Sequence, residues 1–199
     1  TVKQPVLPNE VIGIGASTGG PPVLHTLLTQ LPPDFPLPIF IVQHISKGFL
    51  PGMLHWLSRD TKLRLHIARS GEPVLPGCVY FAPEETNMAF APSGNLLLAP
   101  FGRTAGAHRP ITHLFEALAK TYGKNGLGIL LTGMGNDGAV GLKAMRTAGA
   151  TTIVQDRESS VIFGMPAEAM KIDAVDYVLS PNEIASYLTT IAALKKAPG

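Results

Sequence analysis

Short apolar runs alternate with amphipathic stretches along most of the chain. The apolar runs span four to six residues, which is too short for helices. They are almost continuously apolar, a pattern typical of strands that are buried on both faces of a parallel sheet. We predict five such strands, at residues 11–14, 38–43, 127–132, 150–154 and 175–179.

The amphipathic stretches between these runs predict helices. Proline is tolerated in the first turn of a helix, so Pro21 and Pro22 mark the start of a helix that extends to about Gln30. Further helices are expected at residues 49–59, 111–122, 139–147 and 181–193. Because strands and helices alternate, we expect βαβ units with right-handed crossovers. The fold class is therefore α/β, with an open, mostly parallel, doubly wound sheet of the Rossmann-like type.

The middle of the chain has a different pattern. Three short apolar runs at residues 77–82, 88–91 and 96–99 predict short strands, and the turn residues 92–95 (PSGN) between the last two predict a hairpin. We therefore expect a small antiparallel insertion at about residues 70–105. Residues 11–199 would form one domain, and the polar, proline-containing segment 1–10 would be a linker remnant.

Composition excludes several classes of protein. With 45% hydrophobic and 15% charged residues, the 199-residue chain is not a disordered one. A net charge of +2, without a basic run longer than Lys195–Lys196, argues against nucleic-acid binding. No apolar stretch reaches the roughly 18 residues of a membrane span, so no membrane insertion is expected. The single cysteine, Cys78, predicts a reducing, cytoplasmic location. The chain begins with Thr1, so we expect a piece of a longer protein.

The first predicted strand leads into the glycine-rich turn 15–20 (GASTGG). The dinucleotide fingerprint G-x-G-x-x-G fails here, because Thr18 stands where glycine is required. Residues 15–19 instead match G-x-S-x-G, the spacing of a nucleophile elbow centred on Ser17. A turn of this kind can also be purely structural, or can hold a phosphate with its backbone N–H groups. The pattern alone leaves these alternatives open.

Two further polar residues are predicted to lie near Ser17. His44 follows the second predicted strand, and Asp137 follows the third within the segment 133–138 (GMGNDG). Because the carboxyl ends of parallel strands share one edge, all three side chains can meet there. Asp137 taken alone would be interpreted as a helix N-cap. Together, however, a serine, a histidine and an aspartate at one edge predict the nucleophile, base and orienting acid of a hydrolase.

The other histidines are weaker candidates for the base. They are His25, His55, His66, His108 and His113. Those in predicted helices or edge-like segments are typical packing residues. His108 or His113 would give a rival triad with the chain order of α/β-hydrolases, with Asp60 or Glu84 as its acid. Both histidines, however, lie after a loop at the start of a helix, so His44 remains the predicted base.

Six motifs occur in order along nearly the whole chain. They are residues 11–20 (VIGIGASTGG), 42–44 (VQH), 79–83 (VYFAP), 128–138 (GILLTGMGNDG), 155–156 (QD) and 163–166 (FGMP). In sequence and spacing they resemble the catalytic domain of the CheB-type chemotaxis protein-glutamate methylesterases. The resemblance implies Ser17 as nucleophile, His44 as base and Asp137 as its orienting acid. It also implies that the backbone N–H of Met134 helps to hold the oxyanion. The Thr18 end of the first helix is a second candidate, because helix N-termini favour negative charge.

The resemblance also implies a reaction and partners. Family members hydrolyse γ-glutamyl methyl esters on the cytoplasmic helices of methyl-accepting chemotaxis receptors, which resets signalling during adaptation. Many members also deamidate receptor glutamines. This chemistry requires no cofactor and no metal. Members usually carry an upstream receiver domain, of the response-regulator type, that blocks the site until it is phosphorylated.

One segment departs from the family pattern. Where members have Pro-Ser-Val-Asp at the start of the helix after the hairpin, this chain has residues 110–113 (PITH), which bears on receptor contacts rather than on the triad. Two alternative functions remain. A catalytically idle receptor- or kinase-binding module would keep the same fold. A nucleotide-binding α/β domain would need an acidic residue at the end of the second strand, where the chain has Gln43 and His44.

Overall fold

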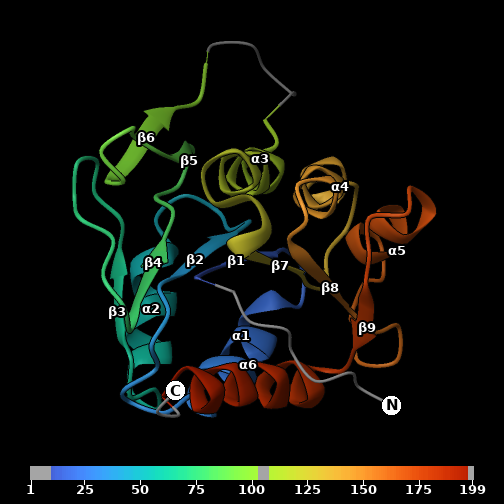
Figure 1. Ribbon diagram of the computed structural model, residues 1–199, viewed down its shortest axis with the longest axis horizontal. Helices are drawn as coiled ribbons and strands as arrows, with labels where there is room; N and C mark the ends of the chain where they lie inside the picture. The colour runs from blue at the N-terminus through green and yellow to red at the C-terminus, as the bar shows by residue number, and fades with distance from the viewer. Residues whose placement is uncertain (1–9, 103–107, 197–199) are drawn as a thin grey trace.

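A computed structural model of the chain describes residues 10–102 and 108–196 (Figure 1). The strands of its main sheet are β1 (Val11–Ala16), β2 (Ile39–Gln43), β3 (Arg64–Ile67), β4 (Cys78–Phe81), β7 (Gly126–Leu130), β8 (Thr151–Gln155) and β9 (Tyr177–Leu179). They lie in the order β3-β4-β2-β1-β7-β8-β9, and every neighbouring pair is parallel. After β1 the chain forms β2, β3 and β4 on one side, with β4 inserted between β2 and the edge strand β3, and then adds β7, β8 and β9 in order on the other side. The switch in direction beside β1 is the place where open α/β sheets bind ligands.

Helices cover both faces of this sheet, so the predicted doubly wound α/β fold is confirmed (Figure 1). One face carries α1 (Gly20–Thr29), α2 (Leu50–Ser58) and α6 (Pro181–Lys196), and the other carries α3 (Pro110–Tyr122), α4 (Ala139–Thr147) and α5 (Met165–Lys171). A short 3-10 helix, η1 (Gly123–Asn125), precedes β7. The buried side chains divide accordingly into two clusters. Leu24 and Leu188 belong to one, and Phe115 and Leu142 to the other.

Helix α3 packs closely against β1 because this strand has glycine at two positions facing the helix. A Cβ atom on Gly13 would lie 2.3 Å from Leu118 Cδ1, and one on Gly15 would lie 2.2 Å from Ile111 Cγ2. Residues two apart in a strand share a face, so both glycines clear the same path for the helix. This close approach brings the first turn of α3 to the carboxyl edge of the sheet.

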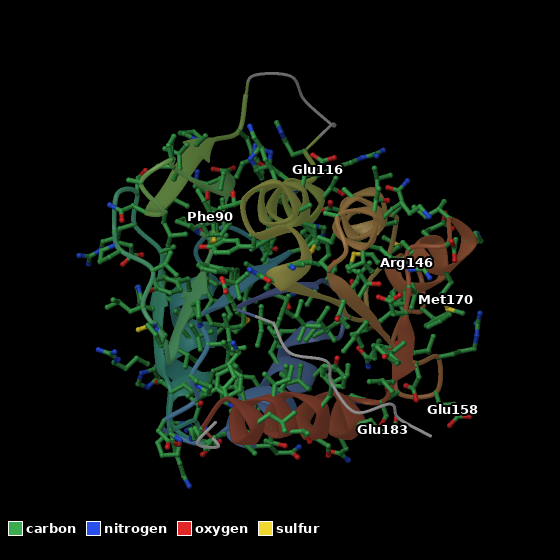
Figure 2. The ribbon with its side chains drawn as sticks, viewed as in Figure 1. Phe90, Glu116, Arg146, Glu158, Met170 and Glu183 are labelled. Carbon is green, nitrogen blue, oxygen red and sulfur yellow. The ribbon has the colours of Figure 1, made fainter. Side chains whose placement is uncertain are left out.

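The predicted antiparallel insertion at about residues 70–105 is wrong over its first part. Strand β4 belongs to the main sheet, where it pairs in parallel with β2 and β3. The antiparallel hairpin consists of β5 (Thr86–Phe90) and β6 (Leu96–Pro100). Phe90 anchors it, with its ring 4.9 Å from Phe40 and 5.2 Å from Tyr122 of α3 (Figure 2). Strand β4 pairs with strands that precede it in the chain, and not with the hairpin that follows it.

Some elements were not predicted. Strand β3 is a half-exposed edge strand without a continuous apolar run, and α5 has only seven residues. Residues 1–9 of the expected linker and 103–107 of the expected insertion lie outside the described residues. Across the described ranges, no helix combines the length and apolar character needed to cross a membrane.

Candidate functional site

Ser17, His44 and Asp137 lie together at the carboxyl edge of the sheet. Ser17 directly follows β1, His44 directly follows β2, and Asp137 lies in the loop between β7 and α4. The Nδ1 atom of His44 is 3.3 Å from Ser17 Oγ, and its Nε2 atom is 2.7 Å from Asp137 Oδ2. The three residues singled out from the sequence thus form one continuous chain of polar contacts across three strands.

Asp137 does not cap the helix that follows it. Helix α4 begins after Gly138, whose φ of 91° favours glycine, and this helix has no side-chain cap. The Asp137 carboxylate instead accepts backbone N–H groups from the first turn of α3, from Ile111 at 3.1 Å and from Thr112 at 2.8 Å. A helix N-terminus favours such a negative charge. The N-cap interpretation is therefore wrong for α4, but Asp137 does accept N–H groups at the N-terminus of another helix, α3.

The environment of Asp137 keeps its carboxyl group ionised. Burial by itself raises the pKa of Asp137, but hydrogen bonds from His44 and from the backbone N–H groups of Thr112 and Ile111 outweigh it, so the pKa lies below its ordinary value. An ionised carboxylate only accepts hydrogen bonds, so the Nε2 atom of His44 must carry a proton. The Nδ1 atom then presents its lone pair to the hydroxyl of Ser17. This tautomer is the one that a general base requires.

The turn that carries Ser17 is held by buried polar groups of neighbouring strands. The N–H of Ser17 donates to the carbonyl oxygen of Thr132 at 3.0 Å, and the Thr132 hydroxyl donates to the carbonyl oxygen of Thr18 at 3.0 Å. Gln155, at the end of β8, accepts the N–H of Thr132 at 2.8 Å. Thr132 and Gln155 are both fully buried. Sequence reasoning missed these supporting residues, although Gln155 lies in one of the six motifs.

The positive φ angle in the turn after β1 belongs to Gly19 and not to Ser17. Among the described non-glycine residues only Glu85 and Asp173 have positive φ, so Ser17 lacks the left-handed strain that a positive φ would bring. Gly19 takes that conformation instead, with φ of 83°, and α1 begins directly after it. The N–H of Gly20 donates to the carbonyl oxygen of Ser17 at 2.8 Å, and Pro21 and Pro22 carry no N–H, so the first three residues of α1 offer no free donor beside Ser17.

The two predicted oxyanion donors are the backbone N–H groups of Met134 and Thr18. Met134 follows Gly133, where an added Cβ would be only 2.5 Å from Ser17 Cβ, and Thr18 follows Ser17 in the chain. Within residues 10–102 and 108–196, neither the Met134 N–H nor the Thr18 N–H donates to a protein acceptor. Both backbone N–H groups are therefore available to a bound oxygen atom.

The rival base and acid pairs are not formed among the described residues. Asp60 bonds to His25 at 2.8 Å. Glu84 accepts backbone N–H groups at the start of α2, which lowers the pKa of its carboxyl group. His108 stacks on a neighbouring phenyl ring, and His113 is exposed on α3. Among the described residues, His44 is therefore the histidine that contacts both a serine and an acid.

A cleft of about 370 Å³ opens beside His44. Its walls come from the ends of β2 and β4 and from the segment before α3, with Ala82, Pro83, Phe101 and His108 among the lining residues. A cleft of this size accommodates a side chain and part of its neighbours. His44, which contacts Ser17, therefore borders a surface on which a larger substrate can rest.

Comparisons with known proteins give one consistent result. The family model described as CheB methylesterase matches residues 12–188. The protein-glutamate methylesterase/protein-glutamine glutaminase of Nitrosospira multiformis is 44% identical over 197 residues, which cover 97% of this chain and 56% of that protein. A protein of the same name from Geobacter metallireducens, numbered 4, is 46% identical over 187 residues, covering 94% and 54% respectively. The chain spans about half the length of the curated relatives it matches.

A solved structure extends the likeness to three dimensions. The Thermotoga maritima CheB methylesterase catalytic domain superposes with a TM-score of 0.85 at 32% identity, covering 93% of this chain and 100% of that one. The family model, the relatives and the solved domain all agree over nearly the whole chain, as the motifs around Ser17, His44 and Asp137 implied. The chain belongs to the CheB methylesterase family.

Proposed function

We propose that this chain is a serine hydrolase that removes methyl groups from γ-glutamyl methyl esters of methyl-accepting chemotaxis receptors. The observation that carries the proposal is the contact chain from Ser17 through His44 to the ionised Asp137. Its substrate lies on the cytoplasmic helices of the receptors, so we place the activity in the cytoplasm. Deamidation of receptor glutamines is the second reaction, which the names of the relatives support.

The first half of the reaction forms an acyl-enzyme. His44 Nδ1 takes the proton of the Ser17 hydroxyl while Oγ attacks the side-chain carbonyl carbon of the substrate. The negative charge that develops on the carbonyl oxygen is held by the backbone N–H groups of Met134 and Thr18. Each donor of this kind is typically worth a factor of about 10²–10³ in rate. Asp137 stabilises the imidazolium and keeps its ring in place.

The second half releases the product. His44 gives its proton to the leaving oxygen, and methanol departs; with glutamine as substrate the leaving group is ammonia. Water then attacks the acyl group while His44 takes a proton from it, and glutamate is released as Ser17 regains its hydrogen. His44 gains a proton in the first step of each half-reaction and loses it in the next, so a full turnover returns the three side chains to their starting protonation state.

The half-length match to the relatives supports a second part of the protein in the full-length chain. We propose that this part is a receiver domain that controls access to the site. The receptor helix would lie along the cleft beside His44.

Methanol release from a methylated chemoreceptor fragment tests the proposal. We expect release by the unsubstituted chain and only background release by Ser17→Ala. Ser58→Ala is the matched control, because Ser58 is exposed at the end of α2 and its hydroxyl donates to the carbonyl oxygen of His55, which is not part of the proposed triad. Equal release by Ser17→Ala and the unsubstituted chain would refute the serine mechanism. A folded chain that releases no methanol would favour the idle binding module.

A further inference from the structure

The carboxamide of Gln43 joins the backbones of the two residues that form the proposed nucleophile and base. Gln43 is the last residue of β2 and directly precedes His44. Its Nε2 atom donates to the main-chain carbonyl oxygen of Ser17 at 2.9 Å and to that of His44 at 2.9 Å. One side chain therefore links the end of β1 to the end of β2 at the point where the proposed proton transfer takes place.

The chemistry of these two bonds fixes the orientation of the amide. A glutamine NH₂ group has two donor hydrogens, and carbonyl oxygens can only accept. Placing Nε2 toward both carbonyls uses its full donor capacity. This orientation leaves the other atom of the carboxamide unsatisfied, because Gln43 Oε1 is buried and has no hydrogen-bond partner among the described residues. A buried polar atom without a partner is uncommon in folded proteins because it is energetically unfavourable. We infer that the two hydrogen bonds made by Nε2 stabilise this orientation by more than the unpartnered Oε1 destabilises it.

The neighbouring helix leaves space for this carboxamide. A Cβ atom on Gly20, the first residue of α1, would lie 2.2 Å from Gln43 Oε1 and 2.8 Å from Ala16 Cβ. The N–H of Gly20 also donates to the carbonyl oxygen of Ser17, at 2.8 Å. Gly20 and Gln43 thus hold the same carbonyl group from two directions, and the missing side chain of Gly20 is what lets the amide fit.

We propose that Gln43 is a positioning residue that holds the backbones of Ser17 and His44 at the separation needed for proton transfer. The inference rests on the proposed function. The Ser17 Oγ to His44 Nδ1 distance of 3.3 Å is already slightly longer than the roughly 2.6–3.2 Å that proton transfer requires. A further displacement is therefore costly, since a misplacement of about 1 Å lowers rates about 10²-fold. Gln43 acts through the two carbonyl groups and not through the reacting atoms.

The test uses Gln43→Met, which keeps the length of the side chain and removes both donors. Labelling of Ser17 by a fluorophosphonate reports the reactivity of the hydroxyl without any receptor substrate. For Gln43→Met we expect the maximal rate constant of labelling, kinact, to fall about 10- to 100-fold. The probe concentration that gives half of this rate, KI, and the fraction of protein that is finally labelled should stay unchanged. Gln30→Met is the matched control, because the Gln30 carboxamide also donates twice, to Thr26 and Asn182, but at the far end of α1.

A second variant tests the same role without changing Gln43. In Gly20→Ala the new methyl group displaces the Gln43 carboxamide, so we expect a fall in kinact of similar size. If Gln43→Met does not fold, the result for Gly20→Ala serves as the test. The positioning role is overturned if kinact stays within twofold of that of the unsubstituted chain. It is also overturned if only the labelled fraction falls while kinact is unchanged; neither result would contradict Ser17 as the nucleophile. If the unsubstituted chain is not labelled at Ser17, the proposed nucleophile fails as well.

Discussion

The substitution Asp137→Asn keeps the size of the side chain but replaces one acceptor oxygen by a donor. In the native chain Oδ2 receives the N–H groups of His44 and Ile111, at 2.7 Å and 3.1 Å, and Oδ1 receives that of Thr112 at 2.8 Å. A carboxamide NH₂ group in the Oδ2 position would face two donors. The imidazole can relieve this conflict by moving its proton from Nε2 to Nδ1. Nδ1 would then donate toward Ser17 and could no longer accept its proton.

We expect this change of tautomer to lower the rate of methanol release on the order of 10⁴-fold, as isosteric changes of the acid in such triads do. At about 1.36 kcal/mol for each factor of ten, this corresponds to about 5.5 kcal/mol of lost transition-state stabilisation. The assay is methanol release at saturating substrate, with circular dichroism to show that the variant is folded. Stability should fall by only about 1–3 kcal/mol, since one buried donor loses its acceptor.

Asp176→Asn is the matched control. Asp176 also accepts a backbone N–H, from Thr152 at 2.9 Å, and pairs with Arg146 at 2.9 Å (Figure 2). It precedes β9 and therefore lies at the amino-end edge of the sheet, away from Ser17. Its rate should stay within twofold of the unsubstituted chain. The reasoning fails if Asp137→Asn, once folded, retains more than a tenth of the native rate.

Asp137 also sets a pH dependence of stability. The pKa of its carboxyl group lies below the ordinary value in the folded chain, because hydrogen bonds outweigh burial. Its contribution to stability is therefore fully present above the unfolded pKa of about 3.9 and is lost as the pH falls through the lower folded value. The difference in unfolding free energy between the unsubstituted chain and Asp137→Asn should be constant from pH 7 to 5 and shrink below about pH 4. A difference that grows on acidification contradicts this assignment.

Three other substitutions have defined effects on stability. Thr132→Val removes the hydroxyl that accepts the N–H of Ile162 at 3.0 Å, so urea titration should show a loss of about 1–3 kcal/mol; a loss below about 0.5 kcal/mol contradicts the expectation. Burial raises the pKa of Tyr80 to about 12, so native stability should fall as the pH rises from about 10 through 12; Tyr80→Phe should make this fall smaller without removing it, since burial also raises the pKa of Tyr122 and Tyr187, and an unchanged fall contradicts the expectation. Gly15→Ala places a methyl group 2.2 Å from Ile111 Cγ2, and the displacement of α3 should cost about 1–3 kcal/mol by thermal unfolding; an unchanged Tm contradicts it.

The sequence was most informative where one local pattern determines the structure. Continuous apolar runs identify the central strands, and the rule that parallel strands end at one edge is enough to predict that Ser17, His44 and Asp137 lie together. The contacts at 3.3 Å and 2.7 Å agree with that placement. The roles of Met134 and Thr18 as oxyanion donors remain predictions.

Features that depend on distant parts of the chain were harder to predict. The residues of β4 are continuously apolar, as in the predicted parallel strands, but its pairing with β2 and β3 depends on contacts outside this run, and the nearby hairpin pattern led to its assignment to the antiparallel insertion. Gln43 and Thr132 bond to backbone groups of Ser17 and Thr18, and such bonds leave no periodic signal in a sequence. The need for glycine at positions 13 and 15 likewise depends on a distant element, because it arises from the close packing of α3 against β1.

A covalent adduct on Ser17 is the most direct test of the central claim. The chain is mixed with a glutamyl methyl ester peptide, quenched in acid within milliseconds, and its proteolytic fragments are analysed by mass spectrometry. The account predicts that the fragment containing Ser17 carries the glutamyl acyl group before free glutamate appears, and that Ser17→Ala shows neither adduct nor product. Full methanol release without an adduct on Ser17, or with the adduct on another residue, would contradict it.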